Sequence, residues 1–321
     1  MRILAVDDDP IILELIREII GLSDDQELLT AGSGPEALKL LDDPATPMID
    51  CFLLDIQMPV MDGIDLCTAL RKRPEFRTTP VVMLTAMTEK RYVDAAFIAG
   101  ATDYITKPFD IGDMQRRLRT AALRRSEMAR FETDASAAVA QGQRRELLAE
   151  VPIYDVDNVI DYFSFENYAR QLSKRSLFTS LAVAVHIRRI GDFHAACEPF
   201  MFESLITDVA EATSDSLRDH SFVMSYAGNG SFICLIEDGH LPDRKTLVSR
   251  INLLLQQMQL DYGLDCPPCV QVCAGDYVRL VGRNSDGISE ALVQAHASAE
   301  SYGQAIDAQV DRIWYEGVVG Q

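Results

Sequence analysis

The chain has 321 residues, of which 48% are hydrophobic, and this is long enough for two globular domains that each bury a core. Its net charge is −19, with 15 basic against 21 acidic side chains in residues 1–125 and 15 against 28 in residues 126–321. Because a DNA-binding protein needs a cationic surface to displace counterions from phosphates, this balance argues against DNA binding.

The first 110 residues alternate between patterns typical of strands and patterns typical of helices. The apolar runs expected to be strands are RILAVD (2–7), ELLTA (27–31), CFLLD (51–55), PVVMLT (80–85) and DYIT (103–106). Helical patterns lie between them, at 11–20, 35–41, 63–72 and 89–100. This alternation predicts an α/β domain with a doubly wound parallel five-stranded sheet.

The first apolar run begins directly after Met1, which leaves no room for the charged head of a signal peptide. No apolar run approaches the ~18 residues that a membrane-spanning helix needs. We therefore expect a cytoplasmic protein with no membrane insertion.

Polar side chains follow the predicted strands where the strands end, and ligands bind outside the carboxyl ends of a parallel sheet. These side chains are Asp7, Asp8, Asp9, Asp55, Thr85 and Lys107. Clustered carboxylates repel one another unless a cation neutralises them, and Mg²⁺ is the dication that takes one or two carboxylates and keeps several waters. A carboxylate beside Mg²⁺ and a lysine can attack a phosphoryl group, so the pattern indicates an aspartyl phosphate site.

The strings ILAVDDDP, LLDIQMPVMDG, LTA and TKPF, in this order, resemble the receiver domain of two-component response regulators. The resemblance covers about residues 1–125 and implies a flavodoxin-like fold. It makes Asp55 the phosphoacceptor, phosphorylated by a histidine kinase or a phosphotransfer protein. It also implies an Mg²⁺ site formed by Asp7, Asp8, Asp55 and the backbone carbonyl of Gln57.

The same resemblance assigns roles around the phosphoacceptor. Thr85 is the hydroxyl that turns toward the phosphoryl group, Lys107 is the paired ammonium, and Tyr104 takes the place of the aromatic switch residue. The Lys107–Pro108 bond is cis in that family, which fits the rule that cis peptides are X–Pro bonds. Two ordinary alternatives stay open: Tyr104 as a strand aromatic, and Asp9 as the N-cap of the first helix.

The segment from Asp110 to about Glu150 contains no proline and one glycine, and its composition favours helix. Its apolar 3-4 spacing is a weak heptad pattern, so it could be a stalk that forms a homodimer or a solvated connector. The predicted division is a receiver domain at 1–125, a helical linker at 126–154 and an output domain at 155–321.

The output domain reads as a second α/β domain with a mixed, largely antiparallel sheet. Helices are expected at 157–175, 199–217, 244–259 and 286–302, and strands at 178–187, 268–275 and 311–315. The stretch SYAGNGSFICLI (225–236) is a predicted hairpin, because Asn-Gly supplies the two positive φ angles of a tight turn.

This order resembles the GGDEF (diguanylate cyclase) domain, of nucleotide-cyclase type. Anchored on Phe232, the signature positions hold Gly228, Asn229, Gly230, Ser231 and Phe232. The two acidic positions are therefore occupied by Gly230 and Ser231.

Other cyclase positions have diverged as well. The metal-binding Asp-x-Asp is replaced by His186-Ile187-Arg188, the substrate-contacting position falls near His194, and the inhibitory Arg-x-x-Asp would fall on Asp219 and Phe222. His186, Arg188 and His194 could hold an anion, but we prefer an ordinary strand histidine and a solvated arginine.

Without carboxylates this site cannot hold Mg²⁺ for the condensation of GTP. We therefore expect a degenerate GGDEF domain that is not an enzyme and that signals to a downstream protein partner or through dimer rearrangement. The receiver would catalyse only its own phosphotransfer and dephosphorylation. The alternatives are a phosphorylation-regulated diguanylate cyclase and a sensor that binds GTP or cyclic di-GMP without turnover.

The seven cysteines are scattered and odd in number, so a disulfide framework is not expected and a reducing compartment is the default. The pair Cys266-x-x-Cys269 could bind zinc or cycle as a dithiol. No second pair or neighbouring histidine completes a tetrahedral set along the sequence, and Cys273 falls within an apolar strand.

Overall fold

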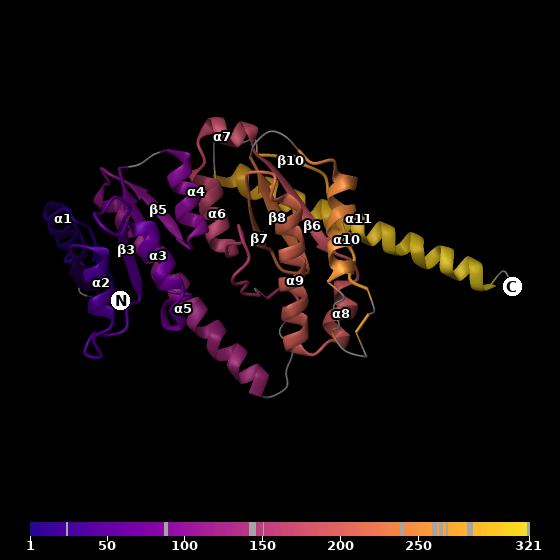
Figure 1. Cartoon of the computed structure of the whole chain (residues 1–321), viewed down its shortest axis with the longest axis horizontal. Helices are drawn as coiled ribbons and strands as arrows, with labels where there is room; N and C mark the ends of the chain where they lie inside the picture. The colour runs from indigo at the N-terminus through magenta and orange to yellow at the C-terminus, as the bar shows by residue number, and fades with distance from the viewer. Residues whose placement is uncertain are drawn as a thin grey trace. The chain divides into compact units, whose positions relative to one another are not determined.

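The computed structural model describes residues 1–23, 25–86, 89–140, 146–149, 151–237, 241–258, 262, 266–267, 269–280 and 285–319 (Figure 1). The chain divides into two compact units, Met1–Ala137 and Ala138–Gln321. The division into a receiver at 1–125, a linker at 126–154 and an output domain at 155–321 remains a prediction. In the described part of the chain, no helix combines the length and apolar character needed to cross a membrane.

The first unit is built on a parallel sheet in the order β2-β1-β3-β4-β5, as the sequence predicts. Its strands are β1 (Arg2–Val6), β2 (Glu27–Ala31), β3 (Cys51–Asp55), β4 (Val81–Thr85) and β5 (Asp103–Thr106). The helices are α1 (Pro10–Ile20), α2 (Gly34–Leu41), α3 (Gly63–Arg71) and α4 (Lys90–Ile98), with a 3-10 turn at Pro74–Phe76. Every residue of β3 and β4 is buried, because helices cover both faces of a doubly wound sheet.

The long helix predicted after the last strand is α5 (Ile111–Ala140). It confirms the helical prediction as far as Ala140, and residues 141–145 lie outside the described residues. Residues 146–149 form a turn, so the expectation of helix up to about residue 150 is wrong at that end.

The second unit contains an antiparallel sheet between two layers of helices. Its strands are β6 (Leu181–Ile187), β7 (Phe222–Tyr226), β8 (Ser231–Ile236), β9 (Val272–Ala274) and β10 (Val278–Arg279). The order is β10-β6-β8-β7, with β9 also paired to β6. The helices are α6 (Tyr162–Gln171), α7 (Lys174–Thr179), α8 (Ile190–Ala196), α9 (Pro199–Leu217), α10 (Arg244–Gln257) and α11 (Ser285–Val319).

The two faces of this sheet have different partners. Alternate residues of β6, Val183, Val185 and Ile187, pack in one core with α9 and α10. Successive side chains of a strand point to opposite faces, so His186 lies on the other face. Figure 1 shows α11 running past β6 and continuing to the C-terminus.

Two predicted elements of the second unit need correction, and one helix was not predicted. The helix expected at 157–175 is two helices, because Leu172 is extended and Ser173 caps α7. The short strand expected at 311–315 is helical, since α11 continues to Val319. The seven-residue helix α8 follows Arg189, whose φ of 54° is left-handed, and the sequence analysis did not predict it.

Candidate functional site

The predicted phosphorylation site lies at the carboxyl ends of β1, β3 and β5. Asp7 is 1% exposed and Asp55 is 4% exposed, while Asp8 is open to solvent. The ammonium group of Lys107 lies 2.6 Å from Asp7 Oδ2 and 2.9 Å from Asp55 Oδ1. A single cation therefore bridges two buried carboxylates that come from different strands.

Local hydrogen bonds hold these side chains in place. Asp9 is the N-cap of α1, because its Oδ1 accepts a hydrogen bond from the Ile11 amide at 2.8 Å. The Asp9 amide donates to Asp7 Oδ1 at 3.0 Å, which fixes the Asp7 carboxylate. The Lys107 amide donates to the Thr85 carbonyl at 2.7 Å, and the Lys107–Pro108 bond is cis, as the resemblance implies.

Burial dominates the electrostatics of Asp55. Desolvation raises the pKa of this carboxyl, and the hydrogen bond and charge of Lys107 offset only part of the rise. Burial acts to lower the pKa of Lys107, but its hydrogen bonds to Asp7 and Asp55 outweigh burial, so this pKa is raised. Lys107 therefore stays protonated beside the carboxylates.

The predicted switch residues lie on the two strands next to this cluster. Thr85, at the end of β4, is fully buried, and Tyr104 on β5 is 2% exposed. Burial raises the pKa of the Tyr104 hydroxyl to about 12, although its hydrogen bond with Thr85 acts in the opposite direction. The two side chains are therefore coupled to each other, while the switch role remains a prediction.

The donor set fits the Mg²⁺ ion that the resemblance implies. Asp7, Asp8 and Asp55 each offer a carboxylate oxygen, and these atoms all lie within 4.8 Å of one another. Hard oxygen atoms are the ligands that Mg²⁺ prefers, and it takes one or two carboxylates directly and keeps several waters. Gln57 lies in the exposed segment after β3, where its carbonyl is the further ligand that the resemblance names.

The Lys107 bridge makes a prediction about stability. We expect Lys107→Met to lower the free energy of unfolding by about 2 kcal/mol at pH 7, because two buried carboxylates lose their cation. The loss should shrink toward pH 4. The raised pKa of Asp55 means that the carboxyl contributes stability at low pH that is lost as the pH rises through that pKa, so its protonation relieves the repulsion.

Urea unfolding of wild type and variant at both pH values measures this effect. Lys90→Met is the matched control, since Lys90 pairs with the half-buried Asp94 one turn along α4, and such pairs within a helix contribute about 0.5 kcal/mol or less. An equal loss for Lys107→Met at pH 7 and pH 4 would contradict the electrostatic explanation.

Three of the five positions aligned with the GGDEF signature, Gly228, Asn229 and Gly230, lie at the tip of the β7–β8 hairpin, and Ser231 and Phe232 begin β8. The hairpin is confirmed, with a loop at 227–230 in which three successive residues have positive φ: 83° at Gly228, 48° at Asn229 and 69° at Gly230. Tyr226 and Phe232 pair at the ends of the strands. The Gly230 amide donates to the Tyr226 hydroxyl at 3.0 Å.

His186 and Ser231 are bound to each other. They are opposite residues on β6 and β8, and His186 Nδ1 lies 2.8 Å from Ser231 Oγ. His186 is 7% exposed and Ser231 is fully buried, and burial lowers the pKa of the histidine. His186 is therefore a buried strand residue, as we prefer from the sequence.

Helix α11 covers this end of the sheet. Asn229 Nδ2 donates to Glu300 Oε1, and Glu300 is also 3.3 Å from His296 Nε2. Arg188 Nε donates to Asp307 Oδ1 at 2.9 Å, and the arginine side chain is only 16% exposed. The expectation of a solvated Arg188 is therefore wrong, because an acidic residue of α11 pairs with it.

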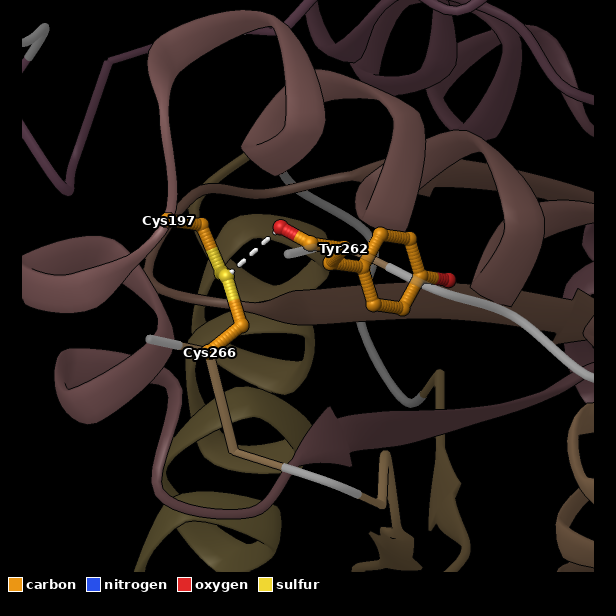
Figure 2. The surroundings of a disulfide bond; sticks show 3 residues. All are labelled: Cys197, Tyr262 and Cys266. Atoms are coloured by element: carbon orange, nitrogen blue, oxygen red, sulfur yellow. Dashed lines mark hydrogen bonds between the residues drawn. A yellow bond between two sulfur atoms is a disulfide. The ribbon is translucent and has the colours of Figure 1, made fainter. Parts of the chain in front are cut away.

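The cysteines depart from the expectation that no disulfide forms. Cys197, after α8, is bonded to Cys266, and Figure 2 shows Cys266 Sγ also directed at the backbone oxygen of Tyr262, at 2.9 Å. Cys266 is therefore not paired with Cys269, which is exposed with a free thiol. A sequence separation of 69 residues explains why no local pattern indicated this bond.

Comparison with known proteins identifies the first unit. Residues 3–119 match the response regulator receiver domain family. The heme response regulator HssR of Staphylococcus aureus (strain Newman) is 39% identical over 125 residues, which are 39% of this chain and 52% of that relative. The chain thus spans about half the length of the curated relatives that it matches.

Two solved structures are also similar to part of this chain. The Francisella response regulator 1452 receiver domain is 32% identical and covers 38% of this chain and 97% of its own, with a TM-score of 0.35. Chemotaxis protein CheY4 of Vibrio cholerae is 30% identical and covers 37% and 97%, with a TM-score of 0.34. On the family match and the HssR similarity, residues 3–119 form a response regulator receiver domain.

Proposed function

We propose that this chain is a response regulator whose Asp55 is phosphorylated by a histidine kinase or a phosphotransfer protein. The observation that carries the proposal is the Lys107 ammonium held between Asp7 and Asp55 at the carboxyl ends of the sheet. Asp55 Oδ attacks the phosphorus of the donor, the P–N bond of the phosphohistidine breaks, and an acyl phosphate forms.

The surrounding residues bind and orient the phosphoryl group. Lys107 offsets the negative charge that develops on its oxygens, and Thr85 provides a hydroxyl next to the Asp55 strand. Mg²⁺, when held by Asp7, Asp8, Asp55 and the Gln57 carbonyl, would supply further charge stabilisation.

We further propose that the second unit is a catalytically inactive GGDEF-like domain. Two observations support this proposal beyond the missing acids. The buried His186 and Ser231 side chains are hydrogen-bonded to each other, so these two positions satisfy one another and not a ligand. A Cβ built at Gly230 would lie 2.6 Å from Ile190 Cγ1, and the positive φ of Gly230 disfavours any side chain. The metal-binding acid of a working cyclase would therefore be strained at this position.

Such a domain would transmit phosphorylation by binding. A downstream protein partner, or a rearranged homodimer, would read the two states of the receiver.

The full chain should make no cyclic di-GMP from GTP and Mg²⁺, with or without beryllofluoride, because the carboxylates that hold catalytic metals are missing. Each 1.36 kcal/mol of lost charge stabilisation slows the reaction about tenfold, so activity should fall below background. Chromatography of the nucleotides measures turnover. Gly230→Asp combined with Ser231→Glu should not restore it while His186 remains. The same protein must be labelled by acetyl phosphate, which shows that the receiver is folded and reactive.

Cyclic di-GMP formation that is proportional to wild-type protein and survives repurification would overturn the inactive assignment. The alternative of a phosphorylation-regulated diguanylate cyclase would then replace it. Equilibrium dialysis with GTP and with cyclic di-GMP tests the remaining alternative, a nucleotide sensor.

A further inference from the structure

Two short pairs of metal-binding residue types meet in the second unit. His194-x-x-Cys197 ends helix α8, and Cys266-x-x-Cys269 precedes β9. The fold brings the pairs together, since Cys197 and Cys266 are bonded with their Cα atoms 5.2 Å apart. No second pair of metal-binding residues lies near Cys266 and Cys269 in the sequence, but the fold brings His194 and Cys197 next to them.

His194 lies on the same side as Cys197. Cys197 is the extended C-cap residue of α8, and it lines one cavity together with His194, Phe202 and Glu203. The imidazole is half-buried and stands edge-on to the Phe202 ring, with the ring centroids 5.1 Å apart. One nitrogen and one sulfur donor therefore border the same small space beside Cys266.

Tyr262, four residues before Cys266, is hydrogen-bonded to helix α9. The Tyr262 hydroxyl donates to Asp208 Oδ2 of α9 at 2.8 Å, and Tyr262 is 7% exposed. Because this anchor is not a cysteine, it remains when the disulfide is broken. We expect this contact to keep Cys266 near Cys197 when the protein is reduced.

We propose that the reduced protein binds one Zn²⁺ through His194, Cys197, Cys266 and Cys269. Three cysteines and one histidine in two closely spaced pairs are a common tetrahedral set of a structural zinc site. A metal there would join α8 to the segment before β9, which is the same connection that the disulfide makes in the oxidised protein.

The two forms interconvert by a defined reaction. A dithiol reductant supplies two electrons and two protons, the S–S bond breaks, and Cys197 and Cys266 become thiols. Zinc then binds the thiolates and the thiol protons are released. In the disulfide form, Cys197 and Cys266 are not thiolates and do not bind the metal. Among the described residues, the group of three or more possible metal ligands that lie close together in this form is Asp7, Asp8 and Asp55.

Cobalt substitution of the full chain tests the proposal. Reduced, metal-free protein titrated with Co²⁺ should develop sulfur-to-cobalt charge-transfer absorption that saturates at about one equivalent, as expected for a tetrahedral thiolate site, and Zn²⁺ should displace it. Cys197→Ser and Cys269→Ser should weaken this absorption. His194→Gln should weaken Co²⁺ binding by more than about tenfold, which is the cost of disturbing even an outer-shell partner.

Two controls separate this site from other metal binding. Cys273→Ala removes a buried cysteine of the neighbouring strand and should leave the absorption unchanged. Asp55→Asn alters the oxygen cluster of the receiver, which cannot give a sulfur band, and should also leave it unchanged. Circular dichroism of each variant establishes that it is folded, and His194→Gln provides a test that keeps every cysteine.

Several results would overturn the proposal. These are no charge-transfer band in the reduced protein, an unchanged spectrum in Cys197→Ser or Cys269→Ser, and unchanged Co²⁺ affinity in folded His194→Gln. Oxidation by hydrogen peroxide, which takes two electrons from the two thiolates and is reduced to water, should release the metal. A band that persists after mass spectrometry shows the Cys197–Cys266 bond would place the metal elsewhere.

Discussion

We expect Asp55→Asn to abolish labelling of the chain by acetyl phosphate. The amide oxygen is a poor nucleophile, so no acyl phosphate can form at this position. The substitution preserves the shape of the side chain, and Lys107 keeps its 2.6 Å contact with Asp7, so the site should stay folded. Mass spectrometry of the intact chain measures the added phosphoryl group, which should be stable in acid and removed by base.

Asp9→Asn is the matched control for this substitution. Asp9 is a neighbouring carboxylate whose role is to cap α1, and Asn caps a helix about as well as Asp. Its labelling should therefore equal that of the wild type. Undiminished labelling of Asp55→Asn would place the phosphoacceptor at another residue.

The pH dependence of the Asp55 carboxyl gives a second measurement on the same residue. In the metal-free protein, burial raises the pKa of Asp55. In an NMR titration without Mg²⁺, the Asp55 carboxyl should therefore titrate at a higher pH than an exposed aspartate. Titration in the range of an ordinary aspartate would contradict the buried environment.

The fold of the receiver could be predicted because each of its strands is a local signal. The runs that became β3 and β4 are apolar up to their last residues, Asp55 and Thr85, as is typical of strands covered on both faces. Parallel strands also bring their carboxyl ends to one edge, so Asp7, Asp55 and Lys107 could be placed together from their positions after three strands.

The second unit was less predictable because its decisive contacts are not local. Nothing near His186 in the sequence indicates Ser231, which is bound to it from another strand, and Asp307 on α11 pairs with Arg188 across 119 residues. A strand was predicted at 311–315 because isoleucine and two aromatic residues favour strands. The prediction is wrong because the long helix α11 continues through these residues. The disulfide is a third such case.

The close contact between Gly63 and the backbone of Asp55 leads to the largest expected change in stability. A Cβ built at Gly63, the first residue of α3, would lie 2.1 Å from the Asp55 carbonyl oxygen and 2.9 Å from its carbonyl carbon. These are backbone atoms of a buried strand, and the Gly63 amide also donates to the Ile56 carbonyl at 3.0 Å. The helix and the strand cannot both keep their places around a methyl group.

We therefore expect Gly63→Ala to lower the free energy of unfolding of the receiver by more than about 3 kcal/mol, since overpacking against backbone cannot be relieved by side-chain rotation. The thermal midpoint should fall by roughly 10 °C. Labelling of Asp55 should also slow, because displacement of its carbonyl moves the carboxylate away from Lys107. Calorimetry of the full chain and the acetyl phosphate assay measure the two effects.

Gly32→Ala is the control within the same unit. The atom nearest to a Cβ built there is Glu36 Oε2 at 3.4 Å, an ordinary contact with a side chain that can move. This variant should stay within about 0.5 kcal/mol of the wild type, as surface substitutions usually do. If Gly63→Ala were as stable as Gly32→Ala, the close approach of α3 to the end of β3 would be wrong. The placement of Asp55 beside Lys107 would then need another support.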